Sequence, residues 1–398
     1  MKATLMIGAA LAAVAPYSLQ AESSVVARRH LYAPWTTNRV ETVAETLGTN
    51  AEARAELDAY GGWAGTGDGR GEGFFRVRKA EGRWWLVDPI GNRFMSQGVA
   101  SFTTGHGRRS RTAFDERWQG SAARWANEEI AFLKSCGFNS LGAWSRICRD
   151  RAVTNRIPYT VCLHPFRAYP RPYSSALVAG TNFLAAADRE IARAAEYRDD
   201  PYCIGYFIGN EYPLSPESLD VYLGHVSRLL KKYDPNHLFL GCRFSLPAIR
   251  PRMEETFRAA GRHCDVISVN HYGRWEPSQD EMRDWESWSG RPFLVSEFYV
   301  KGEDSGLPNR AGAGWRVRTQ EDRGLFYENF TLGLLRNRGC VGWHWFSYMD
   351  NDPTDARPDQ PKPLDSNKGI VRVDYTPYEP LVRHMKAVNF RTRQLLEK

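Results

Sequence analysis

The chain has 398 residues, of which 42% are hydrophobic and 25% charged. This composition is typical of a globular protein with a large core, and it excludes a disordered chain, a collagen or a coiled coil. The net charge of +7 is spread along the chain rather than gathered in a basic stripe. We therefore expect no nucleic-acid partner.

The N-terminal residues 1–21 have the pattern of a secretory signal peptide. Lys2 precedes an apolar run from Leu5 to Val14, and small or polar residues follow as far as Ala21. A run of about ten apolar residues is too short to cross a bilayer, which needs about 20, and no later stretch supplies a membrane span. We expect cleavage after Ala21 and a secreted or periplasmic protein.

Residues 22–73 are mixed in character and predict an N-terminal extension that wraps the main domain. The runs 74–77 and 83–87 then predict a short antiparallel pair. From residue 74 to residue 398, strand-like and helical patterns alternate, which is typical of repeated βα units. Eight strand-like runs favour a (β/α)8 TIM barrel, in which the C-terminal ends of the strands gather around one pocket. These runs are 94–101, 139–145, 157–164, 203–211, 238–244, 265–271, 293–298 and 341–346.

Two of the predicted strands end in a glutamate. The fourth run closes with Asn210-Glu211, and the seventh carries Glu297 near its end. In a barrel, both carboxyl groups would lie at the mouth and could face each other. Hydrolysis of a glycosidic bond with retention uses such a pair about 5–5.5 Å apart, one group as acid and the other as nucleophile. The plain alternative is a glutamate that only ends a strand or forms a salt bridge.

These residues resemble the clan A retaining glycoside hydrolases, in which an Asn precedes the acid/base and a later Glu is the nucleophile. The resemblance covers the whole predicted barrel. Within the clan, the stretches 83–92, 343–352 and 367–371 are similar to agarase-type β-galactanases. The resemblance implies a retaining hydrolase of a polysaccharide or oligosaccharide, such as an agarose- or porphyran-type galactan.

The resemblance also implies roles for single residues. Glu211 would be the general acid/base and Glu297 the nucleophile, while Asn210 would bind the 2-hydroxyl of the sugar. The family pattern places a His or Tyr after strand six, so His271 or Tyr272 would orient Glu297. It also places a Trp on strand eight. Trp343 and Trp345 stand there as candidate substrate contacts. They could form a sugar platform or fill the core, and we favour the core for one of them.

Further polar and aromatic residues close the second and third strands. We expect Trp144, Arg146 and His164 to contact substrate, although each has a structural alternative: core packing for Trp144, a salt bridge for Arg146 and a hydrogen-bonded structural role for His164. The basic loop 105–111 is either a solvated loop or a contact for sulfate or carboxylate groups.

No metal or cofactor is predicted. The acidic stretch 350–355 lacks the glycine and the distal glutamate of an EF-hand loop. The seven cysteines form no C-x-x-C pair, which favours buried free thiols over a zinc or redox site. No H-x-H or H-E-x-x-H occurs, which disfavours a metal-dependent hydrolase. Two alternatives stay open: a clan A β-glucanase or β-mannanase, and a carbohydrate-binding barrel without catalysis.

Overall fold

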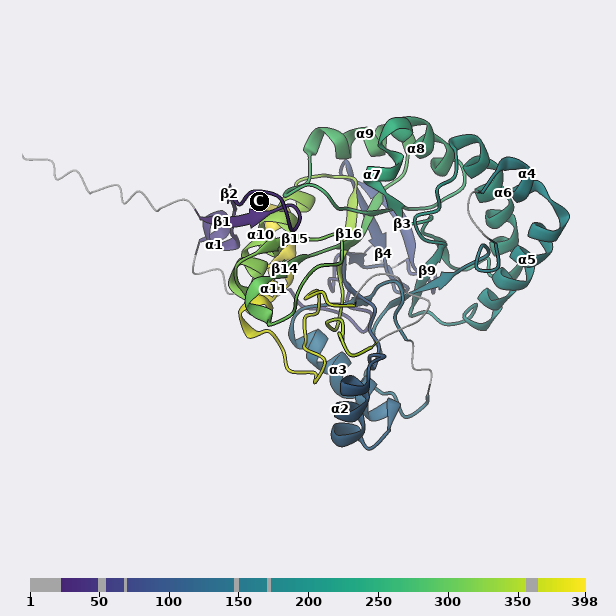
Figure 1. Ribbon diagram of the computed structural model, residues 1–398. Coiled ribbons are helices and arrows are strands. Elements are labelled where there is room, and N and C mark those ends of the chain that lie inside the picture. Colours follow the sequence, from purple (N-terminus) through teal and green to yellow (C-terminus); the bar gives the residue numbers. More distant parts are fainter. Residues whose placement is uncertain (1–22, 49–54, 68–69, 147–149, 170–172, 356–363) are drawn as a thin grey trace, which may run out of the picture.

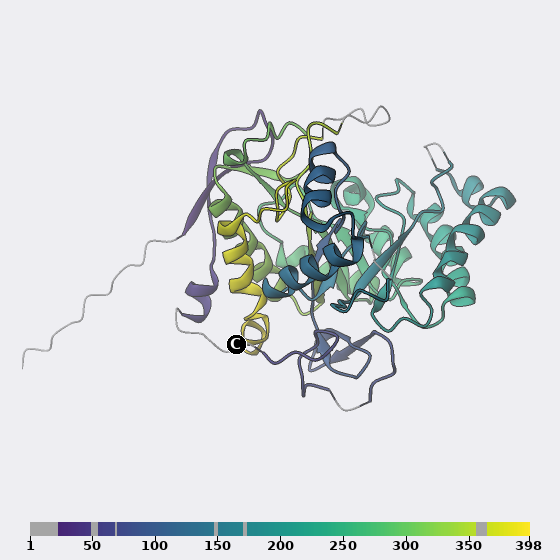
Figure 2. The same cartoon turned by 90° about the horizontal axis from the view of Figure 1, so that it is seen from below.

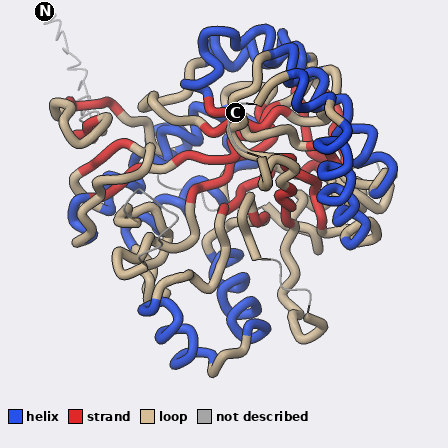
Figure 3. Tube along the Cα trace, turned by 45° about the vertical axis from the view of Figure 1, so that its right-hand side comes forward, coloured by secondary structure: helices blue, strands red, loops and turns tan. Residues whose placement is uncertain are grey.

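The computed structural model describes residues 23–48, 55–67, 70–146, 150–169, 173–355 and 364–398 (Figure 1). The predicted signal peptide lies outside the described residues. A parallel sheet of nine strands forms the centre, and helices surround it (Figure 3). The strands of this sheet, in chain order, are β6 (Ser96–Ala100), β7 (Ser140–Leu141), β8 (Tyr159–Leu163), β9 (Cys203–Ile208), β10 (Leu238–Phe239), β11 (Phe244–Ser245), β12 (Ile267–Asn270), β13 (Phe293–Phe298) and β16 (Cys340–Phe346).

The order of the strands shows how the sheet curves. It runs β10-β9-β8-β7-β6-β16-β13-β12-β11, so the first and last of the eight predicted strands, β6 and β16, are neighbours. The two outer strands, β10 and β11, are halves of the fifth predicted strand. On one side of this stretch, Leu240 donates its backbone N–H to Tyr206 of β9, and on the other side Arg243 donates to Ser268 of β12. The arrangement is consistent with a TIM barrel.

The fifth strand is split by its backbone conformation. Gly241 (φ 78°) and Arg243 (φ 56°) both adopt the left-handed region, which interrupts a strand. The remaining predicted strands form at the expected places, although β7 has only two residues. Between β7 and β8, the described residues 142–146 and 150–158 contain no helix.

Helices follow most of the strands. The longest, α6 (Pro216–Tyr233), begins after the N-cap Ser215, has Pro216 in its first turn, and buries Leu219, Tyr222 and Val226 against the sheet. Among the described helices, none is both long and apolar enough to cross a bilayer. The other α-helices are α1 (Val43–Leu47), α2 (Arg108–Trp118), α3 (Ala122–Ser135), α4 (Ser175–Ala179), α5 (Thr181–Ile191), α7 (Leu246–Ile249), α8 (Met253–Gly261), α9 (Gln279–Ser289), α10 (Gln320–Leu335), α11 (Glu379–Asn389) and α12 (Thr392–Glu397).

Two small sheets flank the central one. β3 (Arg76–Ala80), β4 (Arg83–Val87) and β5 (Arg93–Phe94) are antiparallel and stand at one edge of the molecule (Figure 2). The other sheet has the order β14-β15-β1-β2. It joins the N-terminal strands β1 (Ser24–Arg28) and β2 (Thr36–Arg39) to β14 (Val300–Gly302) and β15 (Trp315–Val317), which follow β13. The start of the described chain therefore packs on the segment that leaves the seventh strand of the barrel.

The described cysteines are all free thiols, and all but Cys162 are fully buried. Cys148 lies outside the described residues. The side chains of these cysteines therefore act as small apolar groups of the core.

Candidate active site

Glu297 lies near the C-terminal end of β13 and is 8% exposed. The hydroxyl of Tyr272 donates to its Oε2 at 2.8 Å, and Nη2 of Arg243 donates to its Oε1. A buried carboxylate needs such partners, because water no longer solvates its charge. Glu297 is thus held in one orientation by a cation and a hydroxyl.

Arg243 is a functional candidate that the sequence reasoning missed. Its side chain is fully buried, and besides Glu297 it binds Asn210, whose Oδ1 accepts from Nη1 at 2.9 Å. The guanidinium carbon lies 5.2 Å from the ring centroid of Trp144. The available signal was an arginine inside an apolar strand-like run, because a fully buried charge is rare unless it is paired.

Glu211 follows β9 in a sharp turn. Its own φ of 50° is in the left-handed region, and its backbone N–H donates to the carbonyl of Cys242 at 3.2 Å. Its Oε1 accepts from Nδ2 of Asn270 at 2.9 Å. The same Nδ2 lies 3.2 Å from Oδ1 of Asn210, and Ser296 donates to the other end of the Asn270 amide at 2.9 Å. The turn at Glu211 is therefore held by its backbone contact with Cys242 and by its side-chain contact with Asn270.

The two glutamates belong to one hydrogen-bond network. It runs from Glu297 through Arg243 to Asn210, and from Asn210 through Asn270 to Glu211. Since both Arg243 and Asn270 donate to the Oδ1 of Asn210, its amide is oriented with Nδ2 outward. Among the described residues, no protein group accepts from this Nδ2. This Nδ2 is thus a hydrogen-bond donor available to a ligand.

Of the pair after strand six, Tyr272 faces Glu297 and His271 does not. The His271 ring packs edge-on against Phe330, with ring centroids 5.0 Å apart, and neither of its ring nitrogens has a partner. Burial lowers the pKa of His271 to about 4, so the ring is neutral at pH 7. Burial, followed by the charge of Glu297, raises the pKa of Tyr272 well above its ordinary value. Its hydroxyl therefore stays protonated and donates to Glu297.

Trp343 and Trp345 are both in the core rather than at the mouth. Trp343 donates its indole N–H to the hydroxyl of Tyr327 at 2.8 Å, and Trp345 donates to the carbonyl of Lys368 at 2.9 Å. Both side chains are fully buried. Alternate residues of a strand point to opposite faces, and here the odd-numbered face meets the helices. Phe346, which is half-buried, borders the mouth instead.

Trp144 and His164 lie beside this network, whereas Arg146 does not. The two rings stack with centroids 4.8 Å apart and planes 5° from parallel. Trp144 is 38% exposed and lines the cleft described below. Burial lowers the pKa of His164 to about 4. Arg146 lines a separate cavity of about 360 Å³, together with Asp150, Arg151, Arg156 and Asp200.

A cleft of about 520 Å³ continues from Trp144 and Phe346. Its walls come from the loops that follow β6 and β16, and from the chain segment 364–373. The arginines of the basic loop 105–111 do not line it: Arg109 binds Asp352 at 2.7 Å instead. Among the described residues, no group of three or more His, Cys, Asp or Glu side chains could hold a metal ion. The cleft is lined by hydroxyl, carboxyl, amino and aromatic groups, including Ser101, Thr103, Asp350, Lys368 and Phe346.

Comparisons with known proteins find sequence similarity to a β-agarase and structural similarity to BpGH50 and to an agarase. No family model matches the chain. β-Agarase B from Vibrio sp. (strain JT0107) is 33% identical over 170 residues, which are 42% of this chain and 17% of that protein. The chain therefore matches less than a fifth of this curated relative.

Two solved structures share the fold over most of the chain. The crystal structure of BpGH50 has a TM-score of 0.82 at 24% identity and covers 96% of this chain and 98% of its own. The structure of an agarase, AgWH50C, has a TM-score of 0.74 at 21% identity and covers 89% of this chain and 69% of its own. The predicted resemblance to agarases is thereby supported, and the assignment to clan A stays a prediction.

Proposed function

We propose that this protein is a retaining glycoside hydrolase that cleaves an agarose-type galactan. The observation that carries the proposal is the single network that joins Glu211 and Glu297 at the C-terminal ends of the parallel strands. The similarity to a β-agarase supports the choice of substrate. If the chain is exported, as residues 1–21 predict, the enzyme meets a polymer too large to enter a cell.

In this mechanism, Glu297 attacks the anomeric carbon while Glu211 gives its proton to the departing glycosidic oxygen. The bond between carbon and that oxygen breaks, and a glycosyl ester with Glu297 forms. Glu211, now ionised, takes a proton from a water molecule, whose oxygen displaces Glu297 with a second inversion. Two inversions give net retention.

The neighbouring groups would assist each step. Arg243 and Tyr272 hold the nucleophile and stabilise its negative charge, both before attack and when Glu297 leaves the ester. The outward Nδ2 of Asn210 would donate to the 2-hydroxyl oxygen of the sugar, a contact that strengthens in the transition state. Trp144 offers an apolar face for a sugar ring beside this point.

The proposal is tested by incubating the protein with agarose, porphyran, carrageenan, laminarin and mannan and sizing the products. We expect cleavage of a galactan, and loss of this cleavage in Glu297→Gln. Cleavage of laminarin or mannan alone would instead indicate a β-glucanase or β-mannanase. Binding without cleavage of any polymer would indicate a carbohydrate-binding barrel. NMR of the first product should show the anomeric configuration of the substrate, and inversion would rule out direct attack by Glu297.

A further inference from the structure

We propose that the turn between β1 and β2 supplies a further substrate-binding residue, Arg29, which binds an anionic substituent of the polymer at the mouth of the barrel. In a galactan this substituent is a sulfate ester. The inference rests on the proposed function, because it assigns a substrate feature to the same active site.

The position of Arg29 carries the inference. Its side chain reaches the C-terminal end of β12, where a Cβ atom on Gly273 would lie 3.3 Å from Nη2 of Arg29. Gly273 directly follows Tyr272, whose hydroxyl binds Glu297. A residue far away in sequence thus reaches the rim of the network that contains Tyr272 and Glu297.

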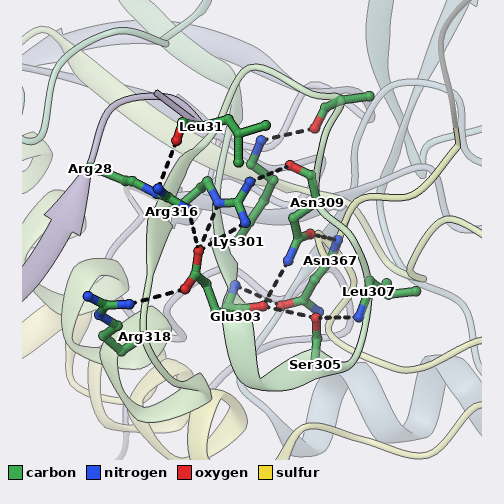
Figure 4. A network of polar contacts seen from close by, with 12 residues as sticks. Arg28, Leu31, Lys301, Glu303, Ser305, Leu307, Asn309, Arg316, Arg318 and Asn367 are labelled. Atoms are coloured by element: carbon green, nitrogen blue, oxygen red, sulfur yellow. Dashed lines mark hydrogen bonds and ion pairs between the residues drawn. The ribbon is translucent and has the colours of Figure 1, made fainter. Parts of the chain in front are cut away.

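A polar network holds the turn in place (Figure 4). Nη1 of Arg28 donates to the carbonyl of Leu31 at 2.7 Å, which closes the turn on itself. Nη2 of Arg28 binds Glu303 at 2.7 Å, and Glu303 also binds Arg316 at 2.9 Å and Arg318 at 3.2 Å. The turn is therefore tied to β15 and to the segment after β14, and Arg29 is presented from a fixed backbone.

The charge around Arg29 favours an anion. Arg274 follows Gly273 in the chain, and it shares the carboxylate of Glu281 with Arg250, at 2.9 Å and 3.2 Å. The Nε of Arg274 is buried without a hydrogen-bond partner. Arg29 itself is exposed and has no carboxylate partner among the described residues. Arg29 thus lies beside a glycine whose chain neighbour, Arg274, shares one carboxylate with a second arginine, and guanidinium geometry suits oxyanions with several acceptor oxygens.

The experiment compares Arg29→Gln with Arg189→Gln, which removes an exposed arginine on α5. Both are made in a Glu297→Gln background, where binding is measured without turnover. The ligands are a sulfated tetrasaccharide from porphyran and a neutral tetrasaccharide from agarose, titrated by calorimetry. We expect Arg29→Gln to weaken binding of the sulfated ligand about tenfold at low salt and of the neutral ligand less than twofold. At 0.5 M NaCl the tenfold effect should shrink, because salt screens the contact.

Three outcomes overturn the inference. Equal losses for both ligands would make Arg29 a contact for neutral sugar or a structural residue, and no loss would remove it from the site. Failure of the sulfated ligand to bind at all would exclude an anion site. A protein that cleaves no galactan but binds the sulfated ligand through Arg29 would disprove the proposed hydrolase and leave this inference standing.

Discussion

The cleft and the rim near Gly273 differ in how their charges are compensated. In the cleft over β16 and β6, Asp352 is paired with Arg109, and Asp350 accepts a hydrogen bond from the backbone N–H of Gly369 at 2.7 Å. At the rim near Gly273, Arg250 and Arg274 share the carboxylate of Glu281, and Arg29 has no acidic partner among the described residues. Under the proposed function, we expect the cleft to bind the sugar rings and the rim to bind a charged substituent of the polymer.

The largest loss of activity should come from replacing Arg243, which contacts both Glu297 and Trp144. Arg243→Met leaves the carboxylate of Glu297 buried without its cation, and breaking such a pair costs about 2–5 kcal/mol. We expect kcat/KM on any cleaved galactan to fall at least about a hundredfold. Thermal unfolding and circular dichroism check that the variant is folded. If folded Arg243→Met keeps more than a tenth of the activity, the network is not part of catalysis.

A smaller loss, in substrate binding, is expected when Trp144 in the cleft is replaced. Trp144→Ala removes the exposed ring that stacks on His164, and a ring–sugar contact of about 1 kcal/mol corresponds to a severalfold change. We expect KM to rise about three- to tenfold on galactan oligosaccharides, with kcat nearly unchanged. Steady-state kinetics with substrates of increasing length measure this. An unchanged KM would exclude Trp144 as a sugar platform.

The core tryptophan Trp343 provides the contrast. Trp343→Phe loses the hydrogen bond to Tyr327 and part of a fully buried ring, so the free energy of unfolding should fall by about 1–3 kcal/mol. KM should not change, because the ring does not reach the mouth. Chemical denaturation and kinetics at 25 °C separate the two readouts. A change in KM without a loss of stability would contradict the assignment of Trp343 to the core.

A further effect, which appears only in the pH dependence of stability, concerns a carboxyl group away from the mouth. Burial raises the pKa of Asp88 to about 7 from 3.8, and the neighbouring Asp58 carboxyl adds to the rise. The folded protein then holds a proton in this window that the unfolded chain has lost, so the free energy of unfolding decreases as pH rises from about 4 to about 7.

Asp88→Asn should flatten this decrease, and the exposed Asp374→Asn should not. Urea denaturation between pH 5 and pH 8 measures the slope. Equal slopes for the natural protein and Asp88→Asn would show that Asp88 does not titrate in this range.

The sequence predicted the barrel and the two glutamates because both rest on local patterns. Apolar runs alternate with helical ones, and each glutamate stands where a run ends. The sequence did not predict the role of Arg243. Its side chain reaches Glu297 because Gly241 and Arg243 adopt left-handed backbone conformations, which split the fifth strand. Which face of β16 meets the helices is a tertiary property, so the spacing of Trp343 and Trp345 could not distinguish core from mouth.

Local sequence patterns also did not predict where the side chains of Arg146 and Arg29 lie. Arg146 follows the second strand, but it turns to a cavity beside Asp150 and Asp200 rather than to the glutamates. Arg29 reaches Gly273 only because β1 pairs with β15, a contact between residues far apart in the chain. Long-range packing decides both positions.

The central claim is that Glu297 is the nucleophile and Glu211 the acid/base. A 2-deoxy-2-fluorogalactosyl donor with a good leaving group should trap the glycosyl ester, because fluorine slows both steps and the leaving group speeds the first. Mass spectrometry of peptides should find the sugar on Glu297. A label on any other residue, or a product of inverted configuration, would contradict the account.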